Sequence, residues 1–86
     1  MWHVSHLRIL RRLRAQPVFL VSSEDALIRA RAECELRGWP WSEPVRVTRD
    51  RRSFGIFTNA DKRGGNVILS IDGQTGEVTH AFYANR

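Results

Sequence analysis

The chain has 86 residues, enough for one domain, and a chain of this length buries only about 60–65% of the surface that it exposes when unfolded. Fourteen Lys and Arg against nine Asp and Glu give a net charge of +5. No stretch approaches the ~20 apolar residues of a membrane-spanning helix, and the single cysteine, Cys34, excludes an internal disulfide and a zinc site built on cysteines. A lone thiol suits a reducing compartment, so we expect a cytoplasmic location, with the periplasm as the alternative.

Residues 1–17 predict a basic amphipathic N-terminal helix or extension. Within 3–15 the apolar side chains, including Leu7, Leu10 and Leu13, fall on one arc at 100° per residue, and arginines fall on the other. Pro17 ends the pattern. Three interpretations stay open: a packed terminal helix at a dimer contact, an extension or upstream-start artefact without fixed structure, and a membrane-surface or targeting segment.

A second helix is predicted from Ser22 or Ser23 to Arg37. Either serine can accept a hydrogen bond from a free N–H of the first turn, and Gly38 suits the left-handed position that ends a helix. The predicted inner stripe is Leu27, Ala30 and Cys34. We therefore expect the Cys34 thiol to pack as a small apolar group.

After residue 44 the apolar period changes from helical to twofold. Four runs alternate apolar and polar residues, and short polar connections join them. They predict an antiparallel meander of four strands, covered on one face by the helix that precedes it. The expected fold class is α+β, with residues 18–86 forming a single αββββ domain after the N-terminal segment.

The polar stretch from Asp72 to Glu77 lies between the last two predicted strands. Its two glycines allow the positive φ angles of a tight turn, and Asp72 and Thr75 can accept hydrogen bonds from nearby amides. A paired-carboxylate site is the alternative on spacing alone. The composition favours a hairpin turn.

The segment GGNVILSIDGQTGEVTHAFY, which follows a helix and GWPW, resembles PepSY-like and cystatin-like small bacterial domains. Its ending is also similar to that of nuclear-transport-factor-like immunity proteins. The matching positions are Gly64, Gly65, Asn66, Val67, Ile71, Asp72, Thr75, Gly76, Glu77 and Val78. The likeness covers about residues 22–84, and it implies a helix followed by a meander that serves as a binding or inhibitory module without catalytic activity.

Three clusters are candidate partner-binding sites. Trp39 and Trp41 form an aromatic corner that would line a groove or cap the core. Arg46, Arg49, Arg51 and Arg52, with Phe54 and Phe57 nearby, would hold nucleic acid by phosphate contacts and stacking, or would simply be a solvated sheet face and hairpin tip. Lys62, Arg63 and Asn66 surround Gly64–Gly65, which would form either an anion-binding nest or a plain hairpin connection.

No catalytic set is apparent in the sequence. His3 and His6 lack a third metal ligand, and His80 meets Cys34 only if the fold brings them together. We expect no enzyme activity, no cofactor and no metal. The expected function is protein or peptide binding, of an inhibitor or immunity type, and the alternative is nucleic-acid binding. A homodimer through the N-terminal helix or a sheet edge is a separate expectation.

Overall fold

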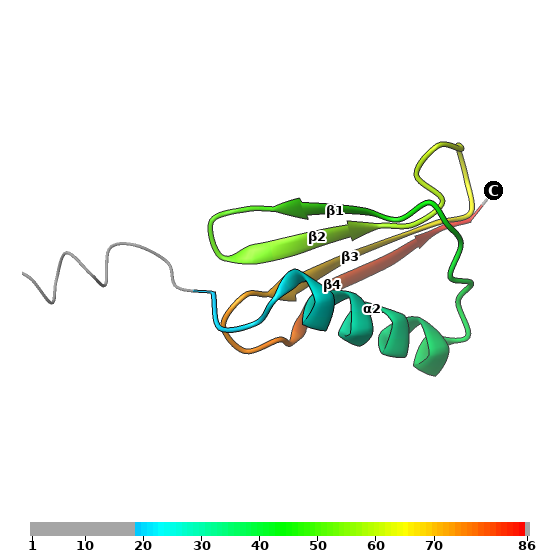
Figure 1. Ribbon diagram of the computed structural model, residues 1–86. Helices are drawn as coiled ribbons and strands as arrows, with labels where there is room; N and C mark the ends of the chain where they lie inside the picture. Colours follow the sequence, from blue (N-terminus) through cyan, green and yellow to red (C-terminus); the bar gives the residue numbers. More distant parts are fainter. Residues whose placement is uncertain (1–18, 86) are drawn as a thin grey trace, which may run out of the picture.

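The computed structural model describes residues 19–85, which form one helix and one four-stranded antiparallel sheet (Figure 1). The elements are α2 (Ser23–Arg37), β1 (Arg46–Arg49), β2 (Ser53–Phe57), β3 (Asn66–Asp72) and β4 (Val78–Ala84). The strands follow one another across the sheet in the order β1-β2-β3-β4. The predicted α+β meander is confirmed, and the predicted helix over 3–15 lies outside the described residues.

Both ends of α2 carry the capping groups that the sequence predicts. The Ser22 hydroxyl accepts a hydrogen bond from the Asp25 N–H at 3.0 Å, and Glu24 and Asp25 lie in the first turn, where the helix dipole favours acids. Gly38 adopts φ 71° and ψ 26°, and the Trp39 N–H donates to the Cys34 carbonyl. The helix therefore begins and ends where local chemistry satisfies its free backbone groups.

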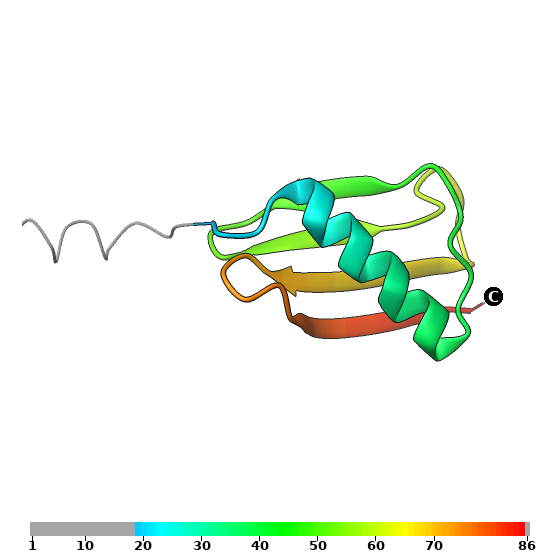
Figure 2. The same ribbon diagram turned by 60° about the horizontal axis from the view of Figure 1, so that its bottom comes forward.

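The buried stripe of α2 consists of Ala26, Ala30 and Cys34, all at most 1% exposed. The prediction placed Leu27 in this stripe, but Leu27 is only half-buried and packs at its margin. Small side chains let the helix lie close to the sheet, and a leucine in the centre would hold it away. The helix crosses the sheet diagonally (Figure 2).

The core lies between α2 and the inner face of the sheet, which is the face that the helix covers. Its sheet side consists of Phe54, Ile56, Val67, Leu69 and Ile71, each at most 3% exposed. Thr58 is also buried, and its hydroxyl accepts a hydrogen bond from the Val67 N–H at 2.8 Å. Within residues 19–85 every buried side-chain N or O atom has a hydrogen-bond partner.

Residues 19–21 attach to the sheet through Gly73. The Gly73 carbonyl accepts hydrogen bonds from the N–H groups of Leu20 and Val21, and the Gly73 N–H donates to the Arg52 carbonyl. The Phe19 ring contacts Phe54 at 5.0 Å between centroids. This junction joins the start of the described chain to both hairpin turns at one end of the sheet.

The helix α2 is too short and too polar to span a membrane, and it is the one helix of the described part.

Candidate binding surface

The stretch from Asp72 to Glu77 is the turn between β3 and β4. The Asp72 carboxylate accepts hydrogen bonds from the N–H groups of Gln74 (2.8 Å) and Thr75 (2.9 Å). The Gly76 N–H donates to the Asp72 carbonyl, and Gly76 has φ 77°. Glu77 contributes its backbone to the ladder, where its carbonyl accepts from the Asp72 N–H. The turn interpretation is confirmed.

The backbone N–H groups of Thr75 and Gln74 hold the pKa of the Asp72 carboxyl below its ordinary value of 3.8. A lowered pKa means that the ionised group stabilises the fold at pH values above 3.8 and that this contribution is lost as the pH falls through the folded-state pKa. Asp72→Asn keeps an acceptor oxygen and does not titrate. We expect the free energy of unfolding of the parent chain to fall more steeply than that of Asp72→Asn between about pH 4 and pH 2, in urea titrations.

Asp61→Asn is the matched control for this pH experiment. Asp61 is an exposed acid of the loop between β2 and β3, and its carboxylate accepts no hydrogen bond from residues 19–85. The pH profile of Asp61→Asn should follow that of the parent chain. Parallel profiles for the parent and Asp72→Asn would contradict the assignment.

The loop of residues 59–66 is organised by Asn66. This side chain is 5% exposed, and its amide N–H₂ donates to the carbonyls of Thr58, Asn59 and Lys62 at 2.9, 2.8 and 3.2 Å. Its Oδ1 accepts from the Gly64 N–H at 2.9 Å. Asn66 was predicted to contact a partner, but its polar atoms are already used inside the loop. Its side chain therefore holds the loop and does not face solvent.

Of the two interpretations of Gly64–Gly65, the anion-binding nest is not found within residues 19–85. Both glycines have positive φ, as a nest requires, but their N–H groups have other partners. The Gly64 N–H donates to Asn66, and the Gly65 N–H donates to the Ala84 carbonyl at 2.7 Å. The other interpretation of this stretch, a hairpin connection, is the correct one.

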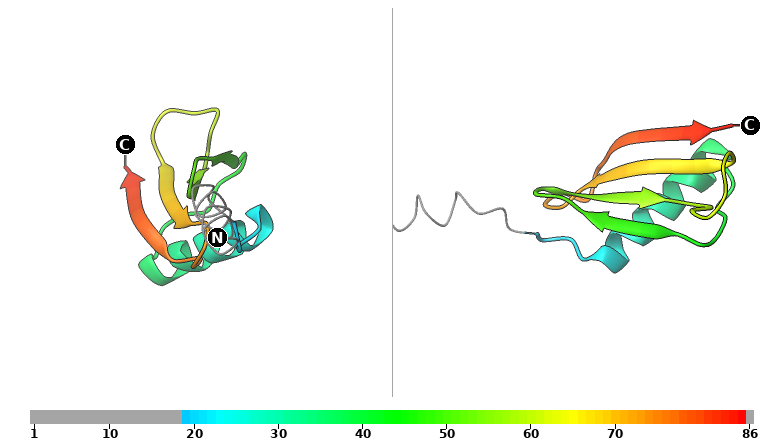
Figure 3. Two further views of the ribbon diagram at one scale, coloured as in Figure 1. Left: turned by 90° about the vertical axis from the view of Figure 1, so that its left-hand side faces the viewer. Right: turned by 90° about the horizontal axis from the view of Figure 1, so that it is seen from above.

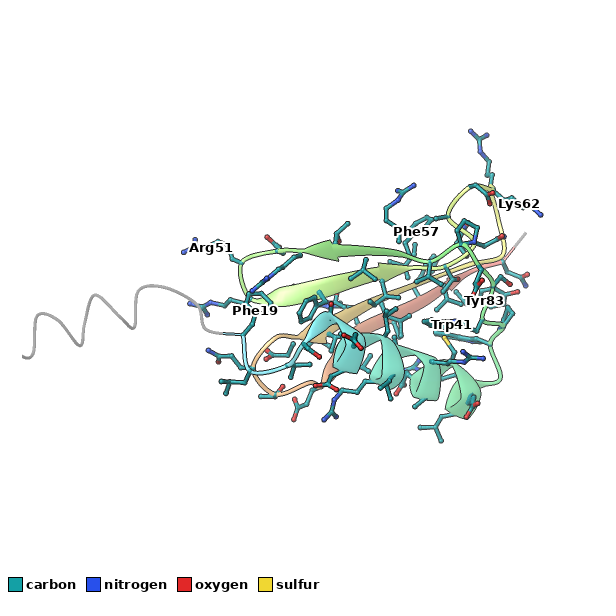
Figure 4. All side chains as sticks on the ribbon, in the orientation of Figure 1. Phe19, Trp41, Arg51, Phe57, Lys62 and Tyr83 are labelled. Atoms are coloured by element: carbon teal, nitrogen blue, oxygen red, sulfur yellow. The ribbon has the colours of Figure 1, made fainter. Side chains whose placement is uncertain are left out.

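Trp39 and Trp41 are half-buried and pack against the core, which confirms the predicted core role for at least one of them. The Trp39 ring lies 5.9 Å from the Tyr83 ring and 4.9 Å from the Arg37 guanidinium. In Figure 4, Trp41 and Tyr83 lie on the helix side of the sheet. Each indole also keeps an exposed part, so a partner contact at this corner stays a prediction.

The predicted basic residues divide between the two ends of the sheet. Arg49, Arg51 and Arg52 belong to the β1–β2 hairpin, beside the Gly73 junction. Lys62 and Arg63 lie in the 59–66 loop at the other end, together with the Trp corner, because the Asn59 N–H donates to the Ser42 carbonyl. Figure 4 shows Arg51 and Lys62 at these opposite ends. The arginines and the lysine are exposed, but they do not form one patch.

The outer face of the sheet, which points away from α2, carries a row of side chains that crosses all four strands. The strand register aligns Arg46 with Phe57, Phe57 with Ile68, and Ile68 with Phe82, and we call these four residues the outer row. Ile68 is 37% exposed and Phe82 60% exposed. The Arg46 guanidinium lies 5.7 Å from the centre of the Phe57 ring.

No described element covers the outer row. Figure 3, right, looks onto the outer face and shows α2 behind the sheet, and Figure 4 shows Phe57 on the side away from the helix. Arg46 and Phe57 were predicted from the sequence as part of a binding surface, whereas Ile68 and Phe82 were not. Phe54, which was paired there with Phe57 as a stacking residue, is buried against Phe19 and is not available to a ligand.

A second row of the outer face ends at His80. Its members, aligned by the register, are Thr48, Gly55, Ser70 and His80. Cys34 lies on the inner side, 1% exposed, and burial raises the pKa of its thiol, with a further increase from Glu33. The sheet therefore separates His80 from Cys34, and no Cys–His pair forms.

Within residues 19–85 no three His, Cys, Asp or Glu side chains gather in a way that would hold a metal ion. Comparisons with protein-family models, with curated proteins and with solved structures found no match. The resemblance to PepSY-like and cystatin-like domains therefore stays a prediction.

Proposed function

We propose that this chain is a binding module without catalytic activity, and that it takes a protein or peptide on the outer row. The observation that carries the proposal is an uncovered sheet face with Phe57, Ile68 and Phe82 side by side. Monomeric proteins seldom expose aligned large apolar side chains without a ligand for them, and aromatic residues and arginine dominate binding energies at interfaces.

The charges around the outer row indicate the chemistry of the partner. Arg46 lies at one end of the row, and exposed basic side chains lie at both ends of the sheet. A partner with apolar side chains flanked by Asp or Glu would match this distribution. The inhibitor or immunity role implied by the resemblance is the sharpest form of this proposal.

Nucleic-acid binding is the second candidate, favoured by one observation. The Phe57 ring, with the Arg46 guanidinium beside it, is a surface on which a single-stranded base would stack. Such binding depends steeply on salt, because phosphate contacts release counterions. Peptide binding centred on apolar side chains depends on salt much less.

The test is a selection from a random peptide library displayed on phage, run beside fluorescence anisotropy with a single-stranded oligonucleotide. We expect the full chain to enrich peptides with a shared apolar and acidic pattern. Ile68→Lys should reduce their binding about tenfold or more, because it places a charge in the centre of the apolar row. Ile28→Lys, on the exposed side of α2, is the matched control and should leave binding unchanged.

Two results would overturn the proposal. One is oligonucleotide binding with a steep salt dependence that Arg46→Glu abolishes while no peptide family is enriched, which would establish the second candidate. The other is enrichment of peptides whose binding Ile68→Lys leaves intact, which would place the binding surface elsewhere.

A further inference from the structure

The two edge strands of the sheet differ in their protection against pairing with another strand. β1 has four residues, two of which are arginines, and Phe19 packs beneath Arg49 at 4.1 Å from its guanidinium. Short length and charge are the usual means by which proteins protect an edge. β4 has seven residues, VTHAFYA, without Lys, Arg, Asp, Glu, Pro or Gly. The register with β3 shifts at Thr79, so β4 is regular from His80 to Ala84, and this part is the less protected of the two edges.

A groove of about 460 Å³ lies between α2 and the β3–β4 turn, on the β4 side of the helix. Its lining is Arg29, Ala32, Glu33, Leu36, Gly76, Glu77 and Val78. Leu36 is 83% exposed, an unusual state for a leucine in the second half of a helix that packs on a sheet. Because α2 runs diagonally, its C-terminal half lies on the side of β4, as Figure 2 shows.

We infer that the chain forms a homodimer in which β4 pairs antiparallel with β4 of a second copy. The two sheets then become one sheet of eight strands, and the two helices lie on the same side of it. In this arrangement Leu36 and the groove of each copy face the other copy across the twofold axis. A register centred on Phe82 would join the two outer rows into one apolar row across the dimer.

The charges favour a second copy as the occupant. A twofold axis places each residue near its own counterpart, so a strand that pairs with itself must avoid charge. β4 meets this condition, whereas β1 would bring arginines together. The groove is lined by positive and negative side chains, Arg29 on one hand and Glu33 and Glu77 on the other. Each copy can therefore place an opposite charge against a charge of the other copy.

A stable dimer needs a contact area that the β4 edge and the groove beside Leu36 supply only together. Stable interfaces bury about 1,200–2,000 Å², more than a seven-residue strand pair supplies alone. The exposed Leu36 and the groove add apolar area directly beside the strand. The inference does not rest on the proposed function, because its observations are the β4 edge and the groove beside α2, although Phe82 belongs both to β4 and to the outer row.

Sedimentation velocity of the full chain over a concentration series tests the inference. We expect a dimer that dissociates on dilution. His80→Lys places a charge on β4, and Leu36→Lys places one at the groove. Each should raise the dimer dissociation constant about tenfold or more, which is about 1.4 kcal/mol.

Two matched variants make the result specific. Thr48→Lys places the same charge in the same cross-strand row as His80 but on the opposite edge, and Ile28→Lys places it on the exposed side of α2 outside the groove. Both should dimerise as the parent does. A monomer at every concentration, a dimer that resists both His80→Lys and Leu36→Lys, or a dimer that Leu10→Lys disperses would overturn the inference.

Discussion

Gly73→Ala is expected to lower the free energy of unfolding by about 3 kcal/mol, at the upper end of the usual cost of overpacking. A Cβ at this position would lie 2.5 Å from Cδ2 of Phe19 and 2.8 Å from the Arg52 carbonyl oxygen. The oxygen belongs to the backbone and is held by the Gly73 N–H, so it cannot move aside without breaking that bond. The measurement is urea unfolding followed by tryptophan fluorescence.

Gly38→Ala is the control for this experiment. Gly38 has φ +71°, but a Cβ there would meet no atom within 4 Å. Gly38→Ala should therefore lower the free energy of unfolding only by the backbone strain of an L-residue in the left-handed region, about 1 kcal/mol. If Gly73→Ala proved no more destabilising than Gly38→Ala, the packing assigned to the junction would be wrong.

Asn66→Ala is expected to cost about 3 kcal/mol of unfolding free energy, because the buried or partly buried carbonyls of Thr58 and Lys62 and the Gly64 N–H lose the hydrogen bond that Asn66 makes with them. The amide of Asn66 is the hydrogen-bond donor for three carbonyls of the 58–62 stretch and the acceptor for the Gly64 N–H. Asn66→Asp should cost at least as much, because a carboxylate would then face those carbonyl oxygens. Chemical unfolding measures both variants.

Lys62→Ala is the matched change in the same loop. The Lys62 side chain is exposed, and the bond that Asn66 makes there involves the Lys62 backbone carbonyl, which alanine retains. We expect a change within about 0.5 kcal/mol, as is usual for surface substitutions. A loss at Lys62→Ala equal to that at Asn66→Ala would show that the loop depends on other contacts.

Local chemistry made much of the fold predictable from the sequence. The serine cap, Gly38 and the change to twofold alternation after residue 44 all act over a few residues, so the elements follow from them. The prediction of the inner stripe of α2 was wrong by one position, because it placed Leu27 where its sequence neighbour Ala26 lies. Hydrophobicity favoured leucine, whereas the distance between helix and sheet favours alanine.

The binding surface was harder to predict, because it depends on strand register. Alternation places Phe82 and Ile68 on one face of their strands but does not show that they align with Phe57. The sequence left an anion-binding nest at Gly64–Gly65 open beside the hairpin connection for a related reason. The glycines supply the backbone shape, but the Ala84 carbonyl that takes one N–H comes from a strand about twenty residues away.

The attachment of residues 19–21 at Gly73 has a mechanical consequence. The described chain enters the sheet at the end of the two hairpin turns and leaves it after β4 at the other end, beside Gly65 (Figure 1). Tension applied at these two points would pass from the Gly73 junction through the 74–77 turn into β4, so the two hydrogen bonds that Leu20 and Val21 donate to the Gly73 carbonyl would bear the force first. Pulled in this way the domain would begin to open at this junction, before the strands of the sheet separate from one another.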